Sequence, residues 1–302
     1  MPQPKNNSKS TIVTTHSPSE DSLVSCLMLT ARRVEYAPIA IKCFQRQTWS
    51  NRELVIVYDA WDTATLQMLM RVIQGLRVRL VRNERHNPTV GFLRNMAVNA
   101  ASGQYCIQWD DDDAFHPDRI TRQMNELRRS GKPGCVLDAR ICHVPSCQFM
   151  FESTRAISEG TALIATDILR QHPYPNITRV MRGNVEVGED TMVVIRLYKA
   201  GMLHIFHCPE LYLHCVHTTN ACSNAHWQTL YEKSQQNKCA QYSGDSKMYH
   251  QMVRLTQVPD ENKAIDDGDG DGDGDGSDSD DGDGSGSDEG GNKRDRVQLR
   301  KI

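Results

Sequence analysis

Apolar residues in the first half of the chain fall into short continuous runs separated by stretches of helical spacing. The runs Val24–Thr30 and Glu53–Asp59 are apolar almost throughout, as expected of strands that a parallel sheet buries on both faces. Stretches with apolar residues every three or four positions predict the helices between the strands. In chain order the expected elements are strand Val24–Thr30, helix Ala37–Gln47, strand Glu53–Asp59, helix Thr63–Gly75, strand Val78–Val81, helix Val90–Ala101, strand Tyr105–Trp109 and helix Asp118–Arg129. This alternation indicates βαβ units around a mostly parallel sheet.

Beyond Arg129 the pattern becomes mixed, and shorter strand-like runs replace the regular alternation. The expected elements are a hairpin of Cys135–Val144 with Cys147–Phe151, a strand at Thr161–Ala165, a helix at Glu189–Ala200 that Gly201 ends, strand-rich sequence at His204–His217 and a last helix at Asn224–Ser234. The predicted fold class is therefore α/β, with a mostly parallel, Rossmann-like sheet flanked by helices and a mixed C-terminal half.

The segment Asp266–Glu289 differs in composition from the rest of the chain. It holds twelve of the 38 acidic residues, alternating with Gly and Ser and without an apolar residue, which predicts a disordered, solvated tail. The Asp-Gly repeat lacks the spaced Glu and flanking helices of a calcium-binding EF-hand loop. Without this segment, 35 basic residues face 26 acidic ones, so the remainder carries about +9 although the whole chain is formally -3. The remainder should attract anions.

These shifts in composition predict three parts: a disordered segment 1–21, one globular domain 22–262 and the acidic tail 263–302. The first part is polar and has no apolar core segment, so we expect neither a signal peptide nor a membrane anchor there. No other stretch approaches the roughly 18 apolar residues of a membrane span. Ten cysteines are scattered singly, without a CxxC pair, which favours free thiols in a reducing compartment and predicts a cytoplasmic protein.

Four consecutive carboxylates follow the predicted strand Tyr105–Trp109, in the sequence WDDDDAFHPDRI. Adjacent carboxylates repel one another, so such a cluster usually needs a metal or a basic ligand. The cluster lies on a strand-to-helix loop at the carboxyl end of a strand, where open α/β sheets bind ligands. The competing interpretation is an acidic surface turn without a ligand.

Five segments in this order, VSCLMLTARR, QTWSNRELVIVYD, GFLRNMAVNAASGQYCIQWDDDDAFHPDRI, GED and VHTTN, together resemble the family 2 glycosyltransferases. The resemblance covers roughly Leu23–Trp227, and the joint order of the motifs is more specific than any one of them. It implies a GT-A fold of the nucleotide-diphospho-sugar transferase superfamily for residues 22–262.

By this resemblance, the family's Asp-x-Asp element falls on Asp110-Asp111-Asp112. Asp112 is then expected to bind a divalent metal, Mn²⁺ or Mg²⁺, that bridges the donor diphosphate, and Asp110 or Asp111 to contact the ribose or a metal-bound water. His217, in VHTTN, matches a position where a histidine approaches the metal or the diphosphate. A hard cation that shares oxygen ligands with phosphates agrees with this assignment.

The resemblance also implies a donor site at the ends of the first two strands. Thr30 and Arg32 stand where the family shows Thr-x-Asn, and Ala31 offers no aromatic ring to stack on a base. Asp59 matches an aspartate that accepts a hydrogen bond from the nucleobase, typically uracil, although Tyr58 replaces the family's usual first Asp. A UDP-sugar is therefore the expected donor.

Two further positions complete the implied site. Arg94, in GFLRN, is expected to contact the donor diphosphate, because a guanidinium matches phosphate geometry. The alternative is an exposed helix residue without a special role. Glu189-Asp190 matches the family's acidic pair, which implies that Asp190 is the general base. Acidic residues at a helix start also cap the helix and favour its dipole, which is the competing explanation.

The resulting prediction is an inverting, metal-dependent glycosyltransferase that moves a sugar from a nucleotide-sugar donor to an acceptor hydroxyl. The acceptor, whether glycan, lipid or protein, stays open, and nucleic acid is not expected as a partner. One alternative is a nucleotidyltransferase, which also uses strand-end Asp and a metal, although a Gly-rich loop is absent after the first strand. The other is a non-catalytic interaction protein with a degenerate transferase fold.

Overall fold

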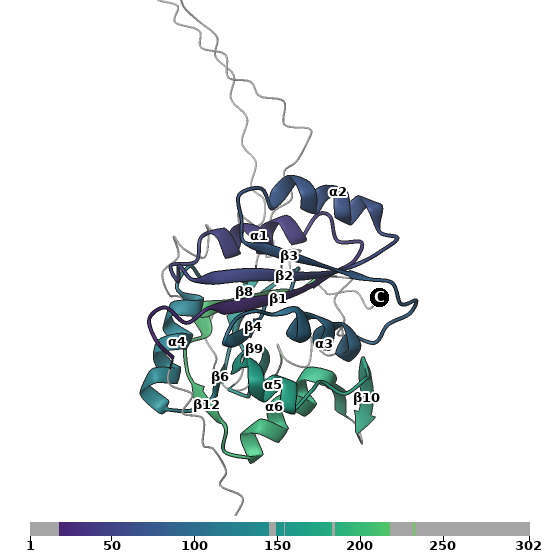
Figure 1. The fold of residues 1–302 in the computed structure, drawn as a ribbon. Helices are drawn as coiled ribbons and strands as arrows, with labels where there is room; N and C mark the ends of the chain where they lie inside the picture. Colours follow the sequence, from purple (N-terminus) through teal and green to yellow (C-terminus); the bar gives the residue numbers. More distant parts are fainter. Residues whose placement is uncertain (1–17, 145–148, 154, 183–184, 218–231, 233–302) are drawn as a thin grey trace, which may run out of the picture. The chain divides into compact units, whose positions relative to one another are not determined.

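A seven-stranded sheet forms the centre of the fold in the computed structural model, which describes residues 18–144, 149–153, 155–182, 185–217 and 232. Its strand order is β12-β6-β9-β4-β1-β2-β3 (Figure 1). The strands are β1 (Val24–Thr30), β2 (Arg52–Asp59), β3 (Val78–Asn83), β4 (Tyr105–Gln108), β6 (Gly134–Leu137), β9 (Ser158–Ala165) and β12 (Leu203–Phe206). All neighbours are parallel except β9, which is antiparallel to both β4 and β6. The mostly parallel α/β fold predicted from the sequence is confirmed.

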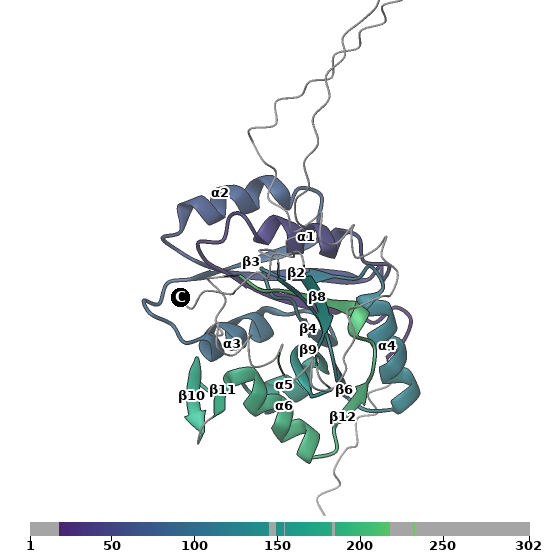
Figure 2. The same cartoon turned by 180° about the vertical axis from the view of Figure 1, so that it is seen from behind.

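Helices cover both faces of this large sheet. They are α1 (Ala37–Gln45), α2 (Thr63–Val72), α3 (Val90–Ala100), α4 (Arg119–Ser130), α5 (Thr166–Gln171) and α6 (Glu189–Lys199). Figures 1 and 2 show α1 and α2 on one face and α3, α5 and α6 on the other. Side-chain caps fix the first turns of α2 and α3. The Asp62 side chain accepts a hydrogen bond from the Thr65 amide at 3.1 Å, and the Thr89 hydroxyl accepts one from the Phe92 amide at 3.2 Å. Gly131, with φ 63°, ends α4.

A second, four-stranded sheet, the small sheet, has the order β5-β13-β7-β8. Its strands are β5 (Ala114–Phe115), β13 (Tyr212–Cys215), β7 (Ile141–Val144) and β8 (Phe149–Glu152). The two residues of β5 directly follow the four aspartates and pair with β13, with Tyr212 opposite Phe115. A strand almost 100 residues later in the chain is thereby held beside the acidic loop.

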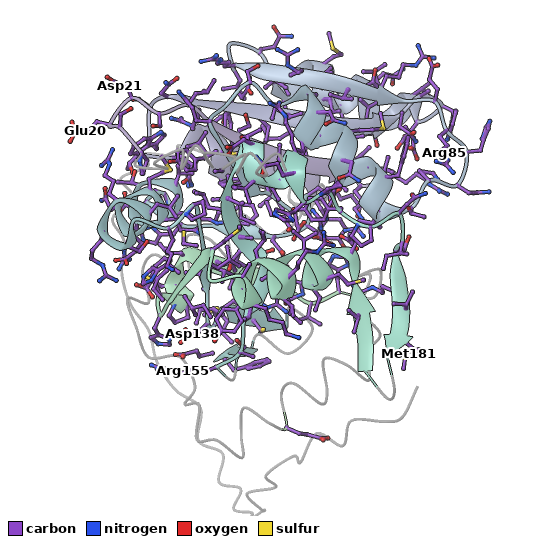
Figure 3. The ribbon with its side chains drawn as sticks, turned by 60° about the horizontal axis from the view of Figure 1, so that its bottom comes forward. Glu20, Asp21, Arg85, Asp138, Arg155 and Met181 are labelled. Carbon is purple, nitrogen blue, oxygen red and sulfur yellow. The ribbon has the colours of Figure 1, made fainter. Side chains whose placement is uncertain are left out.

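The predicted strand Cys135–Val144 is wrong as a single element. It divides into β6 in the large sheet and β7 in the small sheet, because the chain leaves the first sheet at Asp138. The Asp138 amide donates to Phe206, its carbonyl accepts from Ala156, and its carboxylate lies 3.9 Å from Arg155 Nε (Figure 3). The expected antiparallel pairing with the following strand is confirmed for β7 and β8.

Other observed elements also differ from those predicted. β9 begins at Ser158, earlier than the predicted Thr161, while α5 and the hairpin of β10 (Arg179–Arg182) with β11 (Val185–Gly188) were not predicted. The predicted helix Asn224–Ser234 lies outside the described residues apart from Glu232, and so do residues 1–17 and the whole acidic tail. Within the described ranges no helix is long and apolar enough to cross a membrane.

Candidate functional site

The carboxyl ends of β4, β1, β2 and β3 lie next to one another along the large sheet, and we call this border the carboxyl edge. Leu27 of β1 pairs with Gln108 of β4, Thr30 with Tyr58, and Tyr58 with Arg82. This register brings the loops that follow the four strands to one level. The predicted residues at the ends of these strands, Thr30, Arg32, Asp59 and Asp110 to Asp112, therefore gather at this edge.

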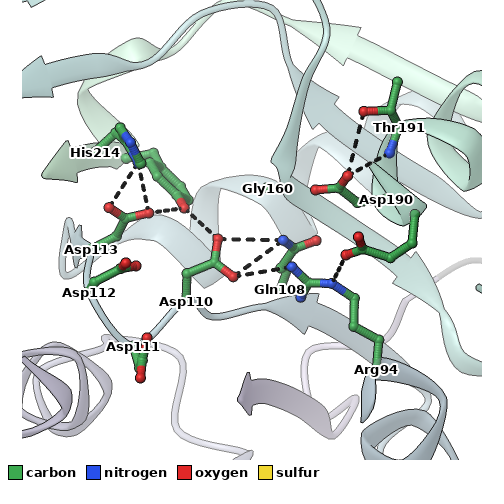
Figure 4. Close-up of polar contacts among 12 residues, drawn as sticks. Arg94, Gln108, Asp110, Asp111, Asp112, Asp113, Gly160, Asp190, Thr191 and His214 are labelled. Atoms are coloured by element: carbon green, nitrogen blue, oxygen red, sulfur yellow. Dashed lines mark hydrogen bonds and ion pairs between the residues drawn. The ribbon is translucent and has the colours of Figure 1, made fainter. Parts of the chain in front are cut away.

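Both carboxylate oxygens of Asp113 are occupied by contacts with β13. Its Oδ1 accepts from the Cys215 amide at 2.9 Å and lies 2.9 Å from His214 Nδ1, and its Oδ2 accepts from the Tyr212 hydroxyl. The residue is 1% exposed. Asp113 thus ties the acidic loop to β13 (Figure 4), which leaves Asp110, Asp111 and Asp112 as the candidates for ligand binding.

Asp112 is held between an arginine and a histidine. Arg33 Nη1 makes an ion pair with Asp112 and lies 3.3 Å from Asp111 Oδ1, while His217 Nε2 lies 3.1 Å from Asp112 Oδ2. Burial acts against ionisation, yet the hydrogen bond from His217 and the charge of Arg33 hold the pKa of Asp112 well below its usual range. The Tyr36 ring stacks on His217 with centroids 4.5 Å apart. The predicted metal residues Asp112 and His217 are thus brought together.

Arg94 links the acidic loop to the start of α6. Its Nε donates to Glu189 Oε1 at 2.6 Å, and its Nη2 lies 3.5 Å from Asp110 Oδ1. The other oxygen of Asp110 lies 2.9 Å from the Tyr212 hydroxyl oxygen, whose one proton is directed to Asp113. The Arg94 side chain is only 11% exposed, so the alternative of an exposed helix residue is wrong. Burial disfavours its charge, but Glu189 and Asp110 outweigh this effect and raise the pKa of Arg94.

The two acidic residues at the start of α6 have different surroundings. Glu189 is 4% exposed, and burial raises its pKa. Asp190 is half-buried, and its Oδ1 accepts from the Thr191 amide at 2.7 Å, a local bond typical of a helix start. A Cβ atom on Gly188 would lie 2.7 Å from Asp190 Oδ1, so only glycine leaves room for this rotamer. Nearby on β9, burial and the charge of Asp190 raise the pKa of Glu159.

The predicted donor-site residues lie at the ends of β1 and β2, next to the acidic loop that follows β4. Thr30, at the end of β1, is 5% exposed, whereas Arg32 is exposed and has a positive φ of 55°. Asp59 accepts a hydrogen bond from Asn83 Nδ2 at 2.7 Å. Arg32 was the predicted donor-site residue, but it is Arg33 that contacts Asp111 and Asp112. The sequence of two adjacent arginines does not show which of them contacts these carboxylates.

Three neighbouring carboxylates on one loop, Asp110, Asp111 and Asp112, bring negative charges close together. Burial and the neighbouring Asp112 raise the pKa of Asp111 well above its usual range. Asp111 Oδ2 is buried and receives no hydrogen bond of ordinary geometry from the described part of the chain. Among the described residues, no set of three His, Cys, Asp or Glu side chains surrounds one point. Carboxylate oxygens such as Asp111 Oδ2 are nevertheless of the type that a hard divalent cation prefers, and such a cation can take its remaining ligands from phosphate or water.

Comparison with known proteins agrees with this geometry. The profile of the family described as Glycosyl transferase family 2 matches residues 25–196. A putative colanic acid biosynthesis glycosyl transferase, WcaA of Escherichia coli K12, is 33% identical over 102 residues, which cover 33% of this chain and 36% of the relative. An uncharacterized glycosyltransferase of Haemophilus influenzae is 24% identical over 175 residues, covering 54% of this chain and 52% of the relative. The chain thus matches about half or less of the length of these relatives.

Solved structures show the same fold. TarS of S. aureus in complex with UDP-GlcNAc superimposes with a TM-score of 0.52 at 17% identity, covering 65% of this chain and 59% of TarS 1–349. The mannosyltransferase PcManGT of Pyrobaculum calidifontis, in complex with GDP-Man and Mn²⁺, gives a TM-score of 0.50 at 12% identity, covering 77% and 69%. Both have the GT-A fold. Because the family profile spans more than half of a chain with this fold, the protein belongs to glycosyl transferase family 2.

Proposed function

We propose that the protein is an inverting, metal-dependent glycosyltransferase that uses a nucleotide-sugar donor. The observation that carries this proposal is the contact of Arg94 with both Asp110 and Glu189. Through this one side chain, the acidic loop and the start of α6 are parts of a single site. Carboxylates suited to a donor metal, and next to Glu189 a carboxylate suited to act as a base, Asp190, therefore lie close to the same arginine.

The chain's own residues would divide the reaction between them. Asp112, steadied by His217, would hold the Mn²⁺ or Mg²⁺ ion, with Asp110 or Asp111 on the ribose or on water. When bound, the ion supplies positive charge to the diphosphate. Asp190 would accept the proton of the acceptor hydroxyl. The new bond from the acceptor oxygen to the anomeric carbon forms as the bond to the diphosphate breaks on the opposite face, so the configuration inverts.

Arg94 and Asp59 have supporting roles in this proposal. Arg94 contacts both Glu189 and Asp110, and its positive charge would stabilise the departing diphosphate. Asp59, held by Asn83, would accept a hydrogen bond from the nucleobase. A UDP-sugar is the first donor to test. A GDP-sugar is the second, since the two structural neighbours described above are complexes with UDP-GlcNAc and GDP-Man.

The released product tests this proposal. The protein is incubated with UDP- and GDP-sugars, Mn²⁺ and a mixture of acceptors, and chromatography then identifies the nucleotide. Nucleoside diphosphate release is expected, and it should fall about 100- to 10,000-fold in Asp190→Asn while donor affinity changes little. The matched control is Asp21→Asn, the same change on an exposed aspartate that precedes β1. Pyrophosphate release would instead identify a nucleotidyltransferase, and binding without turnover an interaction protein.

A further inference from the structure

Two exposed aromatic rings stack on each other at the carboxyl edge. The rings of Trp61 and His86 lie with centroids 4.2 Å apart and an angle of 8° between their planes. Trp61 is 47% exposed and His86 is also exposed. Burying an indole ring is strongly favourable, so an exposed stacked aromatic pair is suited to bind a ligand.

The pair lies along the same edge as the acidic loop. Trp61 follows β2 by two residues and His86 follows β3 by three, while the acidic loop follows β4. The strands lie in the order β4-β1-β2-β3, and neighbouring strands are about 4.8 Å apart. The end of β2 is therefore about 10 Å along the edge from the acidic loop. A ribose attached to a diphosphate bridges such a span.

Hydrogen bonds hold both loops in place before any ligand arrives. Asn83 is fully buried, and its side chain bonds Asp59 at 2.7 Å and the Arg85 amide at 3.0 Å, while its carbonyl accepts from Ala60 at 2.8 Å. Asp62, next to Trp61, caps α2 and accepts from the Arg32 amide. Figure 3 shows Arg85, from the His86 loop, extending outward from the fold. A pre-ordered surface loses less entropy when a ligand binds.

We propose that the Trp61–His86 pair is the stacking surface for the nucleobase of the donor. This inference rests on the proposed function and names the residues that recognise the base. The β1 loop offers no ring at Ala31, and Tyr36 already stacks on His217. Stacking tolerates any base, because every base has a π-face. Discrimination between bases then falls to polar groups close to the stack, such as Asp59, two residues before Trp61.

Affinity measurements separate the base from the diphosphate. Calorimetry with Mn²⁺ compares UDP, GDP and inorganic pyrophosphate on the wild type, Trp61→Ala and Trp61→Phe. We expect Trp61→Ala to weaken binding of the preferred nucleoside diphosphate about 5- to 100-fold and to leave pyrophosphate affinity unchanged. Trp61→Phe should restore most of the loss. Tyr198→Ala, a similar change at a side chain that is 49% exposed on α6, is the matched control and should have no effect.

Tryptophan fluorescence gives an independent readout. Of the four tryptophans, Trp49 and Trp109 are 7% and 0% exposed and Trp227 lies outside the described residues, so comparison with Trp61→Phe is needed to assign an emission change to Trp61. Saturating nucleotide should quench the wild type, and Trp61→Phe should lose most of this quenching while it still binds nucleotide. The difference between the two proteins isolates Trp61 from every other tryptophan.

The outcomes distinguish this inference from the proposed function. If the wild type binds UDP or GDP and Trp61→Ala binds equally well, the stacking inference is wrong while the proposed function stands. Equal losses for nucleotide and pyrophosphate would also overturn it, because Trp61 would then only support the fold of the edge. If neither nucleotide binds the wild type, the proposed function itself is refuted.

Discussion

Replacing Arg94 by Met should destabilise the protein more than any surface charge change. The substitution keeps most of the side-chain volume but leaves Glu189, 4% exposed, without the guanidinium that lies 2.6 Å away. Removing one partner of a buried ion pair costs about 3–5 kcal/mol. This is a large part of a typical unfolding free energy of about 5–15 kcal/mol. For a domain of this size, the melting temperature should fall by roughly 6–20 °C.

The loss should also depend on pH. Burial already raises the pKa of Glu189, and removal of Arg94 should raise it further. A carboxyl whose pKa is raised in the folded state stabilises that state below its unfolded pKa, and this contribution is lost as pH rises through the folded pKa. The Arg94→Met protein should therefore be closest to the wild type in mild acid and furthest from it above neutral pH.

Urea unfolding followed by circular dichroism, at pH 5 and pH 8, measures both effects. Arg94→Met/Glu189→Gln should recover most of the lost stability, since the buried charge of Glu189 is then removed and only Asp110, whose side chain is 29% exposed, has lost its cation. Arg129→Met is the control, because this arginine pairs with Glu126 at 2.7 Å but is exposed, and its loss should be much smaller. A change below about 1 kcal/mol in Arg94→Met, or no recovery in the double variant, would refute the role given to this pair.

Three further predictions follow from the site and the composition. Asp112→Asn should abolish Mn²⁺-dependent binding of nucleoside diphosphate and keep the melting temperature, which calorimetry and thermal unfolding check together. Gly188→Ala places a Cβ 2.7 Å from Asp190 Oδ1, so turnover should fall while donor affinity persists; unchanged kcat would count against Asp190 as the base. Deletion of Ala264–Ile302 should leave a stable, active protein that binds donor equally or slightly more tightly at low salt, with the difference fading as salt rises. Loss of folding on truncation would place the domain boundary further along the chain.

Much of the fold was determined by local sequence. The apolar runs of β1 and β2, and the helical spacing of α1, α2, α3, α4 and α6, depend on neighbouring residues, so these elements were predicted with ends within three residues of those observed. The acidic loop was also visible, because four carboxylates directly after a strand are unusual whatever the rest of the chain does. By contrast, Cys135–Val144 reads as one apolar strand, and only the pairing of its two halves with different sheets divides it.

The assignment of a role to each residue of the site depended on tertiary structure. Sequence alone does not distinguish Asp113 from Asp112; the hydrogen bond from the Cys215 amide, 102 residues away, assigns Asp113 to the fold. In the same way, Arg94 reaches Glu189 across 95 residues and leaves Asp190 as the candidate base. The physical reason is that propensity and periodicity act over a few residues. Ion pairs and ring stacking act between groups that only the sheet register brings together.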